Sequence, residues 1–382
     1  MRMRRGFVLA AAVLTSALVL VGCARDTGTT EPAGGGGTSG EQCARNPAPT
    51  GGAAAATPAP AQPNADGSGL KVGLAYDIGG RGDGSFNDAA AAGLEKAIAD
   101  LGVAPGNVKE LAAAANESED AAATRLRQLV SEGFNPIIAV GFKYATALGV
   151  VAAEAPQVQF AIVDDSSVEL PNVTPLIFAE EQGSFLVGAA AALKTTTCKI
   201  GFVGGVEQPL IQKFEAGYVQ GAKAVAPDIE VDVKYLSPAG DFTGFNDPAK
   251  GQVVAGGELD GGADIIYHAA GASGQGVFQA VKAANKLAIG VDSDQYNIPS
   301  YADTRDIIMT SMLKRVDVAV FDYINAVAAA DLSTLPEIFD LKVDGVGYAT
   351  SGGKVDDIVP DLDAYKSAII SGSITVETTP SS

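Results

Sequence analysis

Asp83-Gly84-Ser85-Phe86-Asn87-Asp88 stands between an apolar run at residues 70–77 and a helical pattern at residues 89–101. This order places the stretch on the first loop after a strand, where an open parallel sheet presents side chains to a ligand. Glycines at 79, 80, 82 and 84 allow the loop to bend sharply, and Ser85 or Asn87 can cap the helix. Phe86 adds an aromatic face, and Asn87 adds a hydrogen-bond donor and an acceptor. The loop therefore predicts a site for a flat, polar small molecule.

Short apolar runs alternate with helical patterns from residue 70 to the end of the chain. The first half predicts strands at 72–75, 108–111, 136–140, 159–163 and 173–178, with helices at 89–101, 119–132, 146–155 and 182–193. The same rhythm restarts at residue 199, with strands at 199–205, 230–235, 265–267, 287–291 and 307–312 and helices at 210–226, 249–259, 276–284 and 316–330. A hairpin at 339–348 and a helix near 361–371 complete the prediction. Such alternation indicates an α/β fold in which two Rossmann-like lobes each carry a mostly parallel sheet covered on both faces.

The N-terminal residues have the composition of an export signal. Three arginines within residues 2–5 precede an apolar run at 7–21, which is too short for an ordinary membrane span. The run ends in Leu20-Val21-Gly22-Cys23, which resembles a bacterial lipobox. The resemblance implies a signal peptide at residues 1–22 and a lipid on the sulfur of Cys23; a plain signal peptide is the alternative. Residues 23–69 are rich in Gly, Pro, Ala and Thr, which predicts a disordered tether.

Composition narrows the classes of function. The chain has 382 residues, 47% of them hydrophobic, which is enough for two domains. Its formal net charge of −19 argues against nucleic-acid binding, which needs clustered Lys and Arg. Cys43 and Cys198 either form a disulfide, which an oxidising compartment would permit, or remain two free thiols. A metal site and a cofactor are not expected, because the chain has one histidine, His268, and no cysteine cluster.

Several motifs, spread in order along the chain, resemble one known family. They are Asp83-x-Ser85-Phe86-Asn87, Gly141-Phe142, Glu181-x-Gly183-Ser184, Phe-Asn-Asp-Pro-Ala-Lys-Gly at 245–251, Gly-Val-Asp-Ser-Asp-Gln at 290–295 and Thr-Ser-Met-Leu-Lys-Arg-Val-Asp at 310–317. Together they resemble the basic membrane protein (Bmp) family, nucleoside-binding lipoproteins of ABC importers with the type I periplasmic-binding fold. The resemblance implies lobe 1 at 70–195 plus about 293–335, and lobe 2 at 196–292 plus about 336–382.

The resemblance also implies a mechanism and partners. A purine nucleoside would bind between the lobes, favour their closure, and pass to a membrane permease driven by ATPase subunits. The protein would act as a monomer, anchored outside the cytoplasmic membrane. Three alternatives remain: a binding protein for another polar ligand such as a sugar, a ligand sensor, or a nucleoside-processing enzyme. The enzyme is disfavoured because no nucleophile with its activator, and no placed acid/base pair, accompanies His268.

Roles for individual residues follow from the same resemblance. Phe86 and Phe245 would sandwich the base, although either ring could instead be ordinary core packing. Asp292 ends an apolar strand and would accept hydrogen bonds from both ribose hydroxyls. Lys314 would donate to the sugar and offset the Asp292 charge; a purely structural ion pair is the alternative. Gly271 would let backbone approach the sugar.

One position departs from the family pattern. Thr146 stands where the family commonly has an aspartate that faces the base. A hydroxyl cannot carry the negative charge that would favour a guanine-type N–H pair, so the preferred base is left open. Asp77 and Asp83 are candidates for the missing acceptor, and either could instead cap the neighbouring helix.

Overall fold

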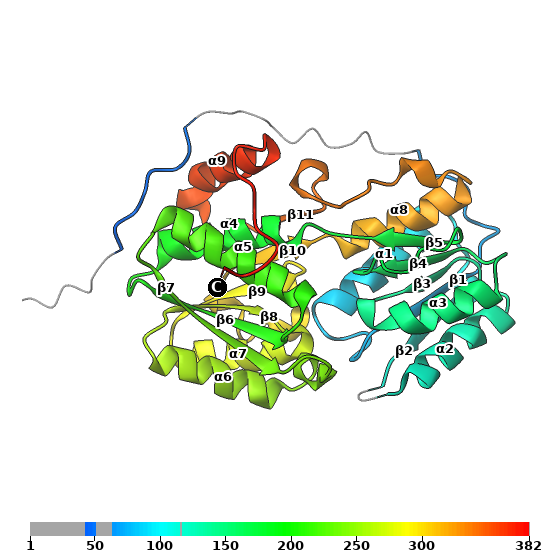
Figure 1. Cartoon of the computed structure of the whole chain (residues 1–382), viewed down its shortest axis with the longest axis horizontal. Coiled ribbons are helices and arrows are strands. Elements are labelled where there is room, and N and C mark those ends of the chain that lie inside the picture. Colours follow the sequence, from blue (N-terminus) through cyan, green and yellow to red (C-terminus); the bar gives the residue numbers. More distant parts are fainter. Residues whose placement is uncertain (1–42, 51–62, 115–116, 382) are drawn as a thin grey trace, which may run out of the picture. The chain divides into compact units, whose positions relative to one another are not determined.

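Figure 1 shows the computed structural model of the chain, which describes residues 43–50, 63–114 and 117–381. The described residues form two sheets with helices on both faces, which confirms the predicted α/β class. The first sheet has the order β2-β1-β3-β4-β5, and all of its neighbouring strands are parallel. Its strands are β1 (Val72–Tyr76), β2 (Val108–Ala112), β3 (Ile137–Ala139), β4 (Phe160–Val163) and β5 (Val173–Leu176).

Helices cover both faces of the first sheet, and together these elements make up lobe 1. They are α1 (Phe86–Asp100), α2 (Glu119–Ser131), α3 (Ala145–Glu154) and α8 (Val316–Ala328). Alternate residues of a strand point to opposite faces, so Leu74 packs in the core under α1 and α8 while Ala75 packs in the core under α2 and α3. Figure 1 shows these helix pairs on opposite sides of the sheet.

The second sheet has the order β11-β10-β9-β8-β6-β7, with β11 antiparallel to β10 and the other pairs parallel. Its strands are β6 (Lys199–Val206), β7 (Glu230–Ser237), β8 (Ile265–Ala269), β9 (Leu287–Asp292), β10 (Ile308–Lys314) and β11 (Val346–Tyr348). The helices of this lobe 2 are α4 (Glu180–Lys194), α5 (Pro209–Val225), α6 (Pro248–Asp260), α7 (Gly274–Ala283) and α9 (Val359–Ile370). Helices α4 and α5 approach so closely that a Cβ at Gly188 would lie 2.1 Å from the carbonyl oxygen of Tyr218.

The boundaries between the lobes differ from the sequence prediction. The sequence places 70–195 and about 293–335 in lobe 1, but α4 packs on α5 and β10 pairs with β9, so both belong to lobe 2. Of these segments, only β1–β5, α1–α3 and α8 belong to lobe 1. The expected hairpin at 339–348 is also wrong. Instead, the Asp340 carboxylate accepts the backbone N–H groups of Lys342 and Val343, and this turn directs β11 antiparallel to β10.

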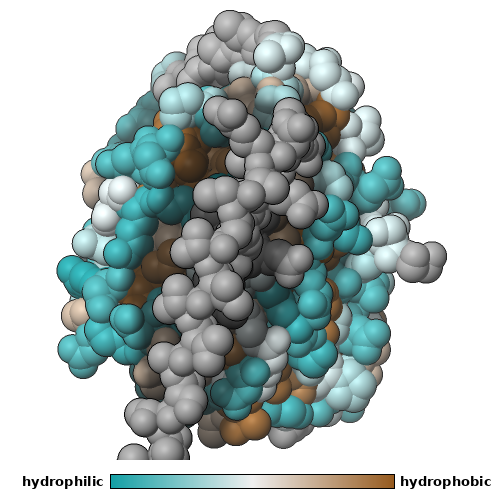
Figure 2. Space-filling view, turned by 90° about the vertical axis from the view of Figure 1, so that its left-hand side faces the viewer, coloured by the Kyte–Doolittle hydropathy of each residue, from teal (hydrophilic) through white to brown (hydrophobic). Residues whose placement is uncertain are grey.

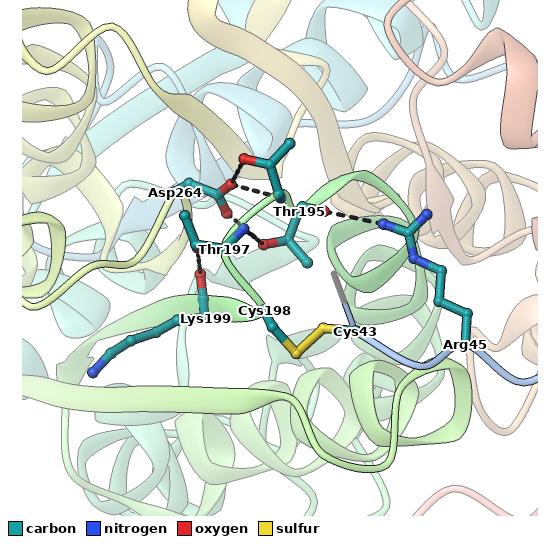
Figure 3. Close-up of a disulfide and its surroundings, with 8 residues drawn as sticks. Cys43, Arg45, Thr195, Thr197, Cys198, Lys199 and Asp264 are labelled. Atoms are coloured by element: carbon teal, nitrogen blue, oxygen red, sulfur yellow. Dashed lines mark hydrogen bonds between the residues drawn. A yellow bond between two sulfur atoms is a disulfide. The ribbon is translucent and has the colours of Figure 1, made fainter. Parts of the chain in front are cut away.

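Part of the predicted tether is held against the folded body. Cys43 is disulfide-bonded to Cys198, with Cα atoms 5.2 Å apart, as Figure 3 shows. The guanidinium of Arg45 donates to the carbonyl of Thr195 at 3.0 Å, and the backbone N–H of Asn46 donates to the carbonyl of Val225 at 2.7 Å. Further along, Gly67 donates its N–H to the carbonyl of Leu101. The prediction of disorder up to residue 69 is therefore wrong for these segments, because the disulfide and these hydrogen bonds fix them to the folded body.

The N-terminal signal and Cys23 lie outside the described residues. Of the helices that the structure does describe, none is long and apolar enough to cross a membrane. On the face in Figure 2, hydrophilic residues lie beside several apolar spots.

Candidate functional site

A cleft of about 70 Å³, partly open to solvent, is lined by residues from both lobes. Among its lining residues are eight that the sequence analysis selected: Asp77, Asp83, Phe86, Asn87, Phe245, Gly271, Asp292 and Lys314. Thr146, on the first turn of α3, is not among the lining residues. The cleft also takes in Phe142, Asp164, Leu210, Ile211 and Phe214, which the sequence analysis did not select as ligand contacts.

The first loop is held rigid by the Asp83 carboxylate. It accepts the backbone N–H groups of Ser85 at 3.0 Å, Asn87 at 2.9 Å and Asp88 at 3.1 Å, so it caps α1. The expectation that Ser85 or Asn87 provides the cap is wrong, since neither side chain bonds the free N–H groups of this helix. Asp83 is thereby occupied by the helix, and burial raises its pKa to about 6.

Asn87 also serves the loop. Its amide oxygen accepts the backbone N–H of Asp77 at 3.0 Å, and its amide nitrogen donates to the carbonyl of Ile78 at 3.3 Å and to the Asp83 carboxylate at 3.1 Å. These bonds tie the end of β1 to the start of α1. Phe86, between two buried residues that are locked in place, is thus presented to the cleft from a fixed backbone.

Phe245 reaches the cleft from lobe 2, at the end of a short 3₁₀ turn, η3 (Phe242–Phe245). Its ring lies over Gly205, where a Cβ would come within 2.4 Å of the ring. The Ser273 hydroxyl donates to the carbonyl of Gly244 at 2.7 Å and fixes the turn. Gly271 has a φ of 54° and comes close to the carbonyl of Phe245, so its lack of a side chain makes room for this turn. The two phenylalanines therefore enter one cleft from separate lobes.

Lys314, the last residue of β10, is buried in a cage of acids and rings. Its Nζ lies 2.6 Å from Asp164 and 3.1 Å from Glu180. The rings of Phe86, Phe178 and Phe214 surround the ammonium, with centroids 5.1 to 5.6 Å away. Burial alone would lower the pKa of Lys314, but the carboxylates outweigh it and raise the pKa above its ordinary value. Lys314 is therefore a cation.

Lys314 has direct partners that the sequence did not predict. It was expected to offset the charge of Asp292, and its cation does oppose the rise that burial causes in the pKa of that carboxyl, but its ion pairs are with Asp164 and Glu180. Asp164 follows the buried strand β4 with a φ of 70°, just as Asp292 ends β9 with a φ of 64°. Asp164 could therefore have been predicted as a site residue from the sequence, because it is an acid directly after an apolar strand. Glu180 begins an alanine-rich helix, and its sequence neighbourhood carries no comparable signal.

Asp292 bonds across to lobe 1. The Ser85 hydroxyl donates to Asp292 Oδ2 at 2.5 Å. Burial raises the pKa of Asp292, and the nearby Lys314 cation opposes that shift. A carboxylate has more acceptor positions than this one hydroxyl uses, so Asp292 can also receive donors from a ligand.

His268 does not belong to the cleft. It is buried on β8, its Nε2 lies 3.0 Å from Oε1 of Gln295, and burial lowers its pKa to about 4. Gln295 in turn donates to the carbonyl of Gly84 at 2.8 Å. His268 is therefore a neutral structural residue.

Known proteins are similar to this chain in sequence and in fold. Residues 70–379 match the family described as "ABC transporter substrate-binding protein PnrA-like" (Bmp). The "ABC transporter nucleoside-binding protein BmpA" of Lactococcus lactis subsp. cremoris is 32% identical over 322 residues, covering 80% of this chain and 89% of that one. An uncharacterized lipoprotein of Pyrococcus horikoshii is 34% identical over 320 residues, covering 77% and 75%. A solute-binding protein of an ABC transporter system from Aeropyrum pernix K1 superposes with a TM-score of 0.67 at 27% identity, covering 82% and 94%.

The fold, the cleft between lobes and these similarities define an extracytoplasmic substrate-binding protein of an ABC importer rather than an enzyme. Within that class, the chain belongs to the Bmp family, as the sequence motifs predict.

Proposed function

We propose that this protein captures a nucleoside, with a purine as the preferred base, by closing its two lobes around it, and delivers it to a membrane permease with ATPase subunits. The observation that carries the proposal is the convergence of Phe86 from lobe 1, Phe245 from lobe 2 and Asp292 in one cleft. The Lactococcus relative named as a nucleoside-binding protein supports the same ligand class.

Each of the three residues suits one part of a nucleoside. Stacking on aromatic side chains contributes about 1–3 kcal/mol per base, and rings from opposite lobes can cover both faces of the base. The Asp292 carboxylate can accept both hydroxyls of a ribose diol, because each of its oxygens has lone pairs to share. Lys314 stays fixed by Asp164 and Glu180, so it contributes a preorganised positive charge beside the sugar. A ligand that contacts both lobes stabilises their closed arrangement.

Asp77 is a better candidate than Asp83 or Thr146 for accepting hydrogen bonds from the edge of the base. Asp83 is occupied by the N–H groups of α1, and Thr146 does not line the cleft. Asp77 lines it, and one of its oxygens already accepts the N–H of Ile78 at 2.7 Å. Its other oxygen, Oδ2, lies beside Gly141, where a Cβ would come within 2.7 Å of it. Burial raises the pKa of Asp77 to about 6, so the carboxylate accepts base N–H groups at neutral pH.

The proposal includes attachment of the protein to the membrane through a lipid. Cleavage after residue 22 and a lipid on Cys23 would attach the monomeric protein to the outer face of the cytoplasmic membrane. The Pyrococcus relative, named a lipoprotein, supports this. Because Cys43 is bonded to Cys198 of lobe 2, the tether would extend from Cys23 only to Cys43.

A thermal-shift screen of the mature chain, residues 23–382 with Cys23→Ser, tests the ligand class. We expect adenosine, guanosine or inosine at 100 times Kd to stabilise the fold by about 2.7 kcal/mol. Free bases, sugars and amino acids at equal concentration should leave Tm unchanged, and Phe245→Ala should abolish the nucleoside shift. Stabilisation by a sugar or an amino acid alone would refute the nucleoside assignment.

A further inference from the structure

Two short 3₁₀ turns, one from each lobe, meet at the edge of the cleft. The turn η2 (Phe142–Tyr144) follows β3 in lobe 1, and η3 follows β7 in lobe 2. The ring centroids of Phe142 and Phe242 are 5.7 Å apart, and the planes are tilted by 58°. Phe142 lines the cleft and Phe242 does not, and both side chains are half-buried. Lys143 adds an ammonium 5.5 Å from the centroid of the Phe242 ring.

The backbone holds both rings in place. Gly141, with a φ of 108°, turns the chain at the end of β3, and its carbonyl accepts the N–H of Tyr144 at 3.1 Å. In lobe 2, the Asp241 carboxylate accepts the N–H of Thr243 at 3.1 Å and its hydroxyl at 2.6 Å. Because the two turns belong to different lobes, the ring contact must break when the lobes separate.

We propose that Phe142, Phe242 and Lys143 form an aromatic latch that holds the lobes closed and slows release of the bound molecule. A tilted pair of rings at this distance has the attractive geometry of aromatic pairs, and a cation over one face adds to it. Phe142 lines the cleft but Phe242 does not, so the part of the latch from lobe 2 lies outside the ligand space. Replacing Phe242 should therefore change how long the ligand stays bound without removing a ligand contact. The inference rests on the proposed capture of a ligand between the lobes.

Ligand release tests the latch. Phe242→Ala should raise the dissociation rate constant about 2- to 10-fold, the size of one aromatic pair, for whichever of adenosine, guanosine, inosine and uridine gives the largest thermal shift. Stopped-flow displacement of that nucleoside measures the rate. Phe242→Tyr keeps the ring and should release at the wild-type rate. Thr243→Ser, in the same turn, keeps the hydroxyl that bonds Asp241 and should do likewise. Equal release from wild type and Phe242→Ala would overturn the latch.

Lobe separation is a second readout that needs no ligand. Val150 on α3 and Val253 on α6 are 49% and 74% exposed, and each helix directly follows one of the two turns. Spin labels on Val150→Cys and Val253→Cys, in the mature chain with Cys23→Ser, report the distance between lobes by pulsed electron resonance. Phe242→Ala should add a longer-distance population, and an unchanged distribution would refute the latch. If no nucleoside binds at all, the proposed function fails, while the label distances still decide the latch.

Discussion

Asp164 and Glu180 beside Lys314, and Glu258 on α6, are all buried carboxylates, but they differ in what surrounds them. Asp164 and Glu180 share the Lys314 ammonium at 2.6 and 3.1 Å. Glu258 is fully buried against Gly201 of β6, and neither of its oxygens has a hydrogen-bond partner among the described residues. Burial raises the pKa of Glu258 to about 9, so it is a neutral acid at pH 7.

The difference shows what distinguishes a site from a buried polar residue. A lone buried acid escapes the cost of desolvation by keeping its proton, whereas a neighbouring cation favours the charged form. Burial raises the pKa of Asp164 to about 7, and the Lys314 cation opposes that shift. Lys314 therefore creates a fixed, charged wall beside Phe86, and such a wall can orient a polar ligand. Glu258 offers no charge and no opening, so burial alone does not indicate function.

Removing the cation should have the largest effect. Lys314→Met leaves Asp164 buried without a counter-charge and leaves Glu180 with Lys213 alone. We expect the unfolding free energy to fall by about 3–5 kcal/mol in urea denaturation. Lys213→Met is the matched control. Lys213 lies 3.2 Å from Glu180 but its side chain is 28% exposed, so its loss should cost less than about 1 kcal/mol. Equal losses for the two variants would contradict the central role of Lys314.

Next in size is the effect of neutralising Asp292. Asp292→Asn keeps the shape but loses the charged acceptor, and a hydrogen bond to a charged group contributes about 1.5–3 kcal/mol. Nucleoside affinity should therefore fall about 10- to 100-fold in isothermal titration calorimetry. Asp294→Asn is the control, because Asp294 bonds Asn297 and Ser351 and does not line the cleft. Comparable losses from both variants would remove Asp292 from the binding role.

The sequence predicted most strands to within two residues, because most of them are short apolar runs bounded by glycine or polar residues. It also predicted the cleft. Phe86 follows β1 and Asp292 ends β9, so both residues lie at the carboxyl edges of their sheets. It did not reveal which acids meet Lys314. That pairing depends on α4, which the sequence analysis assigned to lobe 1 and which in fact brings Glu180 to β10 from its position against α5. The points at which the chain passes from one lobe to the other are set by packing. The periodicity of residues within one helix or strand does not encode them.

Replacing the isolated acid should have the smallest effect near pH 5, and this effect should grow as pH rises. The folded-state pKa of Glu258, about 9, lies above that of an unfolded glutamate, so the folded state binds the extra proton between about pH 4.5 and 9. Stability from this residue is then fully present below about pH 4.5 and is lost as pH rises, by up to about 1.4 kcal/mol per unit. Glu258→Gln cannot ionise, so its stability relative to wild type should increase with pH across that window in urea denaturation at pH 5, 6, 7 and 8. Its nucleoside affinity should equal that of wild type, in contrast with Asp292→Asn. A difference in stability that is constant with pH would show that Glu258 is already charged in the folded protein, and the distinction between the two kinds of buried acid would then fail.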